Sequence, residues 1–278
     1  MKKFILAAAT VLFANMSMDA QSVKVPAPSP TQSIKQDFAL SSIEVSYSRP
    51  GVKGRSIFGD VVPFGKLWRT GANGCTKLTF GEDVKVGGVD VKAGTYSLFS
   101  VPNKDEWEII LNKNITIGGL DGYKTEDDVA RFKVKTAMLG SLVESFTIQV
   151  ANVTSSTADI QISWEKTSVN IPVVADIDTK ISKSIETAMT VDNRPYFQAA
   201  SYYLETGKDL GKALTWVDKA VEMNPKAFWM VHLKAKIQAK SGDKAGAIAT
   251  ANKSIELAKE AKNNDYVALN EKLIASLK

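Results

Sequence analysis

The hydrophobic periodicity of this chain changes once along its length, and that change limits what the chain can fold into. From about Phe38 to Val174, short runs alternate apolar and polar residues, which is the period of half-buried β-strands. From about Asp178 onward, alanine-rich stretches carry apolar residues at helical spacing. The sequence therefore predicts a β + α two-domain protein, with a β-domain over residues 37–174 and a helical domain over 175–278.

Turn signals within the first region favour antiparallel pairing. The pair Gly87-Gly88 separates Val84–Val86 from Val89–Val91, and paired glycines supply the positive φ angles of a two-residue hairpin turn. Many short strands with such turns between them are typical of an antiparallel β-sandwich or barrel. The pattern leaves the choice between these two architectures open.

The helical region contains an internal repeat. Ala213 and Ala247 are 34 residues apart, and so are Ala220 and Ser254. This spacing resembles that of tetratricopeptide repeats, whose helix pairs cross at small residues. The alternative is a plain helical bundle with coincidental spacing. Because grooves of such repeats bind peptides, we expect an unidentified protein or peptide partner on a small tetratricopeptide-like domain.

The N-terminus has the pattern of an export signal. Two lysines precede an apolar run from Phe4 to Ala14, which is too short to span a bilayer. We predict a signal peptide over residues 1–20, cleaved near Ala20, and a periplasmic or extracellular protein. An uncleaved anchor is the alternative, although no second apolar segment suggests an integral membrane protein. Residues 21–36 contain three prolines and predict a flexible tether.

Composition excludes several classes of function. The chain has 35 Lys and Arg against 30 Asp and Glu, a formal net charge of +5, which is too small to indicate a nucleic-acid partner. One histidine and one cysteine exclude a Cys/His zinc site and an intrachain disulfide. The acidic run Glu126-Asp127-Asp128 lacks the alternating oxygen ligands of a calcium loop. We therefore predict no metal and no cofactor.

The single histidine and cysteine are weak candidates for catalysis. His232 lies in the helical repeat between Val231 and Leu233, where a packing role is expected. Cys75 as a nucleophile would need a nearby base to form its thiolate, and the histidine is in the other predicted domain. We expect Cys75 to be a small buried residue, with pairing to a second chain as the alternative.

One segment, from Ser46 to Thr76, combines cations with glycine-rich turns. It holds five cationic residues and one acid, Asp60, and five glycines lie between Gly51 and Gly71. Guanidinium groups and exposed backbone N–H groups both bind carboxylate or phosphate oxygens, and a tryptophan adds a stacking face for a ring or sugar. The candidate ligand-binding residues are Arg49, Lys53, Arg55, Lys66, Trp68, Arg69 and Asn73.

These residues favour a non-enzymatic envelope protein that binds an anionic or polar ligand, possible examples being an anionic small molecule or a glycan, and we assign no catalytic residue. One alternative is a hydrolase acting on an envelope polymer, in which Arg55 and Arg69 stabilise negative charge and Asp60 acts as acid or base. The other is a purely structural scaffold, in which the cations pair with acids of the same domain. The acids considered for that pairing are Glu82, Asp83, Glu106 and Glu108.

Several longer motifs carry a family resemblance. They are Ser48-Arg49-Pro50, Trp68-Arg69-Thr70-Gly71-Ala72-Asn73, Ala93-Gly94-Thr95-Tyr96-Ser97-Leu98-Phe99, and Trp164-Glu165-Lys166-Thr167 with Ile171-Pro172. Over about residues 35–174 the chain resembles the domain-of-unknown-function family 2911 (DUF2911). The resemblance implies an exported bacterial β-domain, often followed by a helical tail, with no established activity. In the family pattern an acid usually follows the Gly-Ala-Asn triplet, whereas Gly74 and Cys75 follow here, so no role of that acid carries over.

Overall fold

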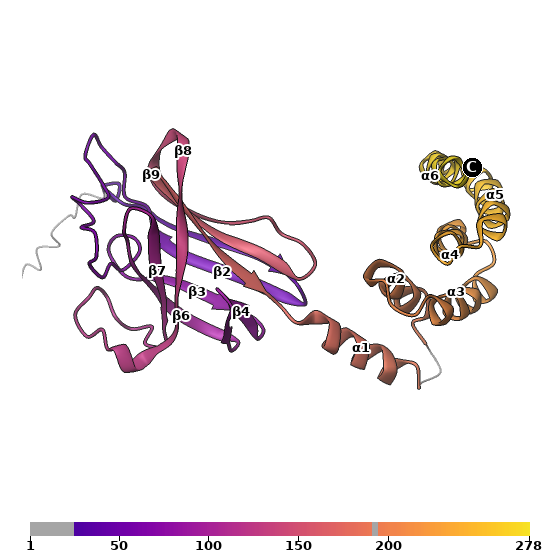
Figure 1. Cartoon of the computed structure of the whole chain (residues 1–278), viewed down its shortest axis with the longest axis horizontal. Coiled ribbons are helices and arrows are strands. Elements are labelled where there is room, and N and C mark those ends of the chain that lie inside the picture. The colour runs from indigo at the N-terminus through magenta and orange to yellow at the C-terminus, as the bar shows by residue number, and fades with distance from the viewer. Residues whose placement is uncertain (1–24, 191–193) are drawn as a thin grey trace, which may run out of the picture. The chain divides into compact units, whose positions relative to one another are not determined.

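The computed structural model describes residues 25–190 and 194–278, which form two compact units divided between Ala175 and Asp176. A β-sheet unit precedes a helical unit (Figure 1), so the predicted β + α layout is confirmed. The predicted signal peptide, residues 1–20, lies outside the described residues.

The described part of the first unit forms nine strands in one antiparallel sheet. They are β1 (Thr31–Phe38), β2 (Ser41–Ser48), β3 (Thr76–Phe80), β4 (Val84–Val86), β5 (Val89–Val91), β6 (Gly94–Val101), β7 (Glu106–Asn112), β8 (Asp128–Ala151) and β9 (Thr157–Val174). A short 3-10 helix, Thr125–Asp127, precedes β8. The strand order is β1-β2-β3-β6-β7-β8-β9-β4-β5, so the sheet is open, with β1 and β5 at its edges.

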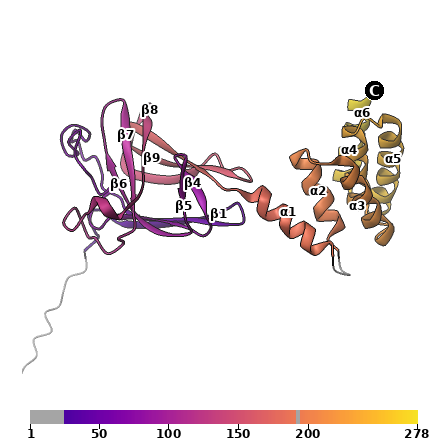
Figure 2. The ribbon, with the colours of Figure 1, turned by 60° about the horizontal axis from the view of Figure 1, so that its bottom comes forward.

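The long strands β8 and β9 bend the sheet over on itself. The first part of β8 pairs with β7, and the register between β8 and β9 shifts at Met138, Val143 and Thr147. Such irregularities bend strands and increase their twist. Beyond the shifts, the free edge of β8 meets the end of β2: the Tyr47 hydroxyl donates to the Ile148 carbonyl over 3.0 Å. In Figure 2, β8 and β9 accordingly lie on the side of the unit opposite β1.

An aromatic cluster fills the space that this bend encloses. Trp107 and Trp164 are 1% and 2% exposed, and the Trp164 ring stacks on that of Trp68 at a centroid distance of 6.0 Å. The Phe58 ring lies 5.0 Å from that of Trp107, and the Phe146 ring 5.5 Å from that of Trp164. Because these rings come from β7, β8, β9 and the loop after β2, the cluster holds that loop on the sheet.

The flexible tether expected over residues 21–36 is wrong for its last six residues. β1 pairs with β2 along its whole length, from Thr31 opposite Ser48 to Phe38 opposite Ser41. The prolines end at Pro30, after which every backbone N–H is available to the ladder. The prolines in the first half of the segment concealed the alternating pattern of the second half.

The helical unit contains six helices in its described part. They are α1 (Ile177–Ala188), α2 (Tyr196–Thr206), α3 (Leu210–Met223), α4 (Phe228–Lys240), α5 (Lys244–Glu260) and α6 (Asn264–Leu277). No described helix combines the length and the apolar character needed to cross a membrane.

The 34-residue spacing falls on equivalent places of two helix pairs. Ala213 and Ala247 are fully buried, near the starts of α3 and α5. Asp209 caps α3 by accepting from the Lys212 N–H over 3.0 Å, and Asp243 caps α5 in the same way. The two helices thus begin with the same capping residue and bury the same small residue, which lets backbones approach closely.

We expect Gly87→Ala to destabilise the β unit more than Gly88→Ala. Both glycines have positive φ, 58° and 85°, so a Cβ atom adds a conformational strain of about 1–2 kcal/mol at either position. At Gly87 it would also overlap the ring of Phe132, whereas at Gly88 it would meet open space. Overpacking adds about 1–3 kcal/mol to the Gly87 variant alone. Urea denaturation of both variants measures the difference, and equal losses of unfolding free energy would contradict this packing.

Candidate functional site

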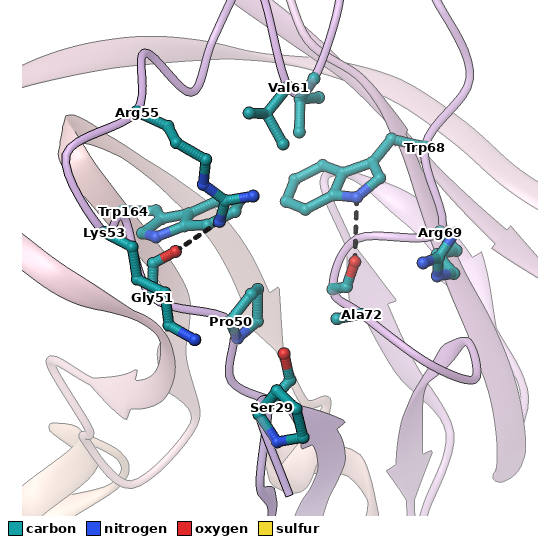
Figure 3. Close-up of a pocket in the computed structure, with 13 residues that line it drawn as sticks. Ser29, Pro50, Gly51, Lys53, Arg55, Val61, Trp68, Arg69, Ala72 and Trp164 are labelled. Carbon is teal, nitrogen blue, oxygen red and sulfur yellow. Dashed lines mark hydrogen bonds between the residues drawn. The ribbon is translucent and has the colours of Figure 1, made fainter.

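A cavity of about 360 Å³ lies in the β unit, above the aromatic cluster. Its walls come from the segment before β1, the loop between β2 and β3, and one residue of β9, Trp164. Four of the seven candidate residues line it: Lys53, Arg55, Trp68 and Arg69 (Figure 3). The fold therefore gathers the cationic loop at a concave surface.

Backbone carbonyl groups hold the Arg55 side chain in place. Its Nε donates to the Val52 carbonyl over 3.1 Å, and its Nη2 donates to the Gly51 carbonyl over 2.7 Å. Figure 3 draws the guanidinium beside the indoles of Trp164 and Trp68, and its Nη1 has no hydrogen-bond partner in the described part of the chain. A guanidinium fixed on one edge is therefore presented to the cavity on the other.

Trp68 is fixed at both its backbone and its side chain. Its N–H donates to the Ser100 carbonyl over 2.8 Å and its carbonyl accepts from the Ser100 N–H over 2.9 Å. The indole Nε1 donates to the Gly71 carbonyl over 3.0 Å (Figure 3). Ser100 belongs to β6, so the sheet sets the position of this cavity wall.

The walls of the cavity contain donors that lack an acceptor. Arg69 Nε and Trp164 Nε1 are buried and have no hydrogen-bond partner among the described residues. Buried donors are nearly always paired in folded proteins, so unpaired ones call for an explanation. Both nitrogens are enclosed by the protein, so they lie behind the cavity surface and are not part of the surface that a ligand would contact.

The cations of the cavity form no ion pair among the described residues, although the Glu144 carboxylate accepts from the Lys53 backbone N–H over 2.9 Å. None of the residues that line the cavity is acidic, and no ion pair joins Lys53, Arg55 or Arg69 to an acid in the described part of the chain. Three of the acids that a scaffold would have used have other partners. Asp83 pairs with Lys92, Glu106 with Lys133 and Glu108 with Arg131.

Three candidate residues lie outside the cavity lining. Arg49 is structural, since its guanidinium donates to the Phe146 carbonyl and the Thr147 hydroxyl of β8. Lys66 is exposed on the loop. Asn73 positions one wall, because its side-chain nitrogen donates to the carbonyl of Ser29, a lining residue, over 3.1 Å.

The sequence did not point to two walls of the cavity. Ser29 lay within the predicted tether, and Trp164 is separated from the cationic loop by about ninety residues. The only signal for Trp164 was the motif that begins with it, Trp164-Glu165-Lys166-Thr167. Its proximity to Trp68 depends on the bend in β8 and β9.

The loops around the cavity contain several strained residues. Lys53, Thr70 and Asn73 in the loop between β2 and β3, and Glu165, which follows Trp164 in β9, have φ angles between 49° and 58°, a left-handed conformation that is unfavourable for residues other than glycine. Thr70 is the most unusual, because it is β-branched and fully buried. Its hydroxyl bonds to that of Ser100 at 2.8 Å. Strain of this kind persists at functional sites more often than elsewhere.

A family comparison covers the region that contains this cavity. The model of the family described as "Protein of unknown function (DUF2911)" matches residues 29–173. The chain belongs to the DUF2911 family. The matched segment includes all nine strands except Val174, the last residue of β9, and it includes the lining residues from Ser29 to Trp164. Searches of curated proteins and of solved structures find no match.

The other candidate reactive groups lie apart from the cavity lining. Asp60 is exposed at a turn. Cys75 is buried, with 8% of its surface exposed, and its Sγ donates to the Gly119 carbonyl over 3.4 Å. In the described chain no group of three or more His, Cys, Asp or Glu residues is arranged to hold a metal ion. His232 Nδ1 lies 2.8 Å from Asn270 Oδ1 in the helical unit.

Cys75 should react slowly with a thiol reagent in the native protein. Burial raises the pKa of its thiol, so the nucleophilic thiolate is scarce near neutral pH. As the chain has one cysteine, a chromogenic disulfide reagent reports on this residue alone. We expect labelling at least about tenfold slower than that of free cysteine, and fast labelling once urea unfolds the protein. Equal rates in the native and unfolded states would indicate an accessible, reactive thiol.

Proposed function

We propose that this DUF2911 protein is an exported cell-envelope protein whose β unit binds an anionic ligand in the cavity lined by Lys53, Arg55 and Arg69. The observation that carries the proposal is the absence of any acid from the lining of a cavity with three cations. Cations that line a concave surface raise the local concentration of anions.

The arrangement of the site favours binding over hydrolysis. A hydrolase of the kind considered above needs Asp60 within hydrogen-bond reach of the reacting group. Asp60 is exposed and does not line the cavity with Arg55 and Arg69. No other carboxylate lines it. The cavity therefore supplies groups that attract an anion and none that would move a proton to or from it.

Export is proposed from the sequence. The two N-terminal lysines and the apolar run from Phe4 to Ala14 support a signal peptide cleaved near Ala20. Fractionation of cells that express the full chain tests it: the mature protein should start near Gln21 and lie outside the cytoplasm.

We also propose that the helical unit is tetratricopeptide-like and docks a protein or peptide. The repeat positions Ala213, Ala220, Ala247 and Ser254 are all buried, which supports close helix crossings at 34-residue intervals. Trp229 on α4 is 40% exposed and is a suitable anchor for a partner, since tryptophan is enriched at interface hot spots. Trp229→Ala should weaken the binding of any partner that is found by cross-linking in cells. Trp216 on α3 packs within the unit and is left unchanged in this variant.

Arg55→Ala should abolish anion binding, whereas Lys66→Ala should not. Removing a charge-assisted hydrogen bond costs about 1.5–3 kcal/mol, which corresponds to roughly 10–100-fold in affinity. Lys66 is a matched control, because it is a cation of the same loop outside the cavity. Thermal-shift assays with a panel of small carboxylates, phosphates and sulfated sugars compare the variants.

At least one panel member should raise the melting temperature of the unaltered protein and of Lys66→Ala, and it should leave Arg55→Ala and Arg69→Ala unshifted. A panel that shifts none of the proteins, or shifts all four equally, would contradict a binding role for the cavity.

A further inference from the structure

We infer that the edge strand β1 pairs with β1 of a second copy of this chain, so that two sheets join into one. In the described residues β1 pairs with β2 alone and forms one edge of the sheet. Its eight residues, Thr31–Phe38, exceed the commonest strand length of about five or six. The register with β2 is constant from end to end, without a bulge. Natural proteins usually shorten, bend or cover such an edge to prevent strand addition.

The backbone of β1 leaves alternate residues available to another strand. The Arg49 N–H donates to the Pro30 carbonyl over 2.9 Å, and the constant register then directs the backbone groups of the even-numbered residues toward β2. The odd-numbered residues therefore direct their N–H and carbonyl groups away from the sheet. Of these outward groups, the Asp37 carbonyl accepts from the Gln36 side chain over 3.0 Å, and a carbonyl can accept a second bond.

The side chains of the outward residues do not shield this backbone, because three of the four bond across to β2. The contacts are Thr31 Oγ1 to Ser48 Oγ at 3.4 Å, Ser33 Oγ to Ser46 Oγ at 3.1 Å and Lys35 Nζ to Glu44 Oε1 at 2.7 Å. A lysine on an edge strand usually opposes strand addition, but here its ammonium is bound to the neighbouring strand. All four outward residues are exposed, so a second strand can reach them.

A second copy fits this edge by symmetry and by charge. Antiparallel strands related by a two-fold axis place one residue opposite itself, and a centre on Ile34 or on Lys35 gives the longest overlap of the eight residues. A centre on Lys35 would set two ammonium groups directly opposite each other, which is destabilising. With the centre on Ile34, Lys35 lies opposite Ser33 of the second copy. Asp37 then lies opposite Thr31, so no like charges face each other.

The size of the edge favours a second copy over a foreign peptide. Strand addition of a peptide gains its specificity from pockets for alternate side chains. The cavity that Ser33 and Lys35 help to line measures about 250 Å³, below the usual range of ligand sites. A contact of eight residues on each side is also small beside the roughly 20–30 of a standard interface. We therefore expect a reversible dimer with micromolar affinity.

Ser33→Pro should weaken the dimer and leave the β unit folded. Proline removes the N–H of residue 33, which faces outward and is not used by the ladder to β2. Ser33→Ala is the matched control, because it loses the same hydroxyl and keeps the N–H. Analytical ultracentrifugation of the protein, purified from cells that express the full chain, measures the dimer. Its affinity should be unchanged in Ser33→Ala and lower by about tenfold or more in Ser33→Pro, with circular dichroism as the check on folding.

A cysteine at the two-fold axis tests the register independently of the proline variant. In a Cys75→Ser background, Ile34→Cys should form a disulfide-linked dimer on mild oxidation, because opposite residues of a non-hydrogen-bonded pair have Cα atoms about 4.5 Å apart. Gln36→Cys is the matched control. It would lie about 13 Å along the strand from its counterpart, so it should not cross-link. Electrophoresis without a reducing agent measures both.

Four results would overturn the inference. A protein that sediments as a monomer at every concentration, with no cross-link through Ile34→Cys, has no such dimer. A monomer that carries a co-purified peptide, lost in Ser33→Pro, would assign the edge to a foreign strand. A dimer unaffected by Ser33→Pro would use another surface. Cross-linking through Gln36→Cys in place of Ile34→Cys would exclude the centre on Ile34.

Discussion

The contact between the end of β2 and the later part of β8 is the interaction on which the rest of the β unit depends. The Tyr47 hydroxyl both donates to the carbonyl of Ile148 and accepts from its N–H, each over 3.0 Å. Arg49 continues the contact to the Phe146 carbonyl, and the Phe146 N–H in turn donates to the Pro50 carbonyl over 2.9 Å. These bonds join two strands that are far apart in the sheet order. They hold the sheet in its bent form without closing it.

The bend explains why the cavity is rigid. It brings Trp164 of β9 beneath the loop that carries Trp68, and the two rings stack with only 18° between their planes. Stacked and edge-on aromatic pairs stabilise by about 0.5–1.5 kcal/mol beyond their buried area. The cluster also excludes water from the floor of the cavity, and a lower local dielectric strengthens every charged contact formed above it. A loop of glycines and cations would otherwise lose much conformational entropy on binding a ligand.

Features of the structure that depend on local sequence were predictable, and those that depend on the bend were not. The hairpin at Gly87-Gly88 follows from backbone conformation, since both residues have positive φ, and strand periodicity marked the β region. In the sequence, nothing distinguishes Arg49 from the other cations of the segment. Its structural role depends on the position of β8, whose Phe146 carbonyl accepts from its guanidinium. Trp164 likewise lines the cavity because of the bend in β8 and β9. β1 was missed because its segment also contains prolines, whose influence ends at Pro30.

The distribution of charge in the described residues fits the proposed binding role of the cavity. Lys53, Arg55 and Arg69 form no ion pair with a described acid, whereas Glu108 and Asp128 are paired with Arg131. Stability alone would be served by moving an acid into the cavity or by replacing a cation with a neutral residue, because like charges near one another oppose the folded state. The strained backbone of Thr70 beside the same cavity also lowers the stability of the folded state. Cations without an ion-pair partner and a strained backbone thus occur at one site, and an anionic ligand would supply the partner that the cations lack.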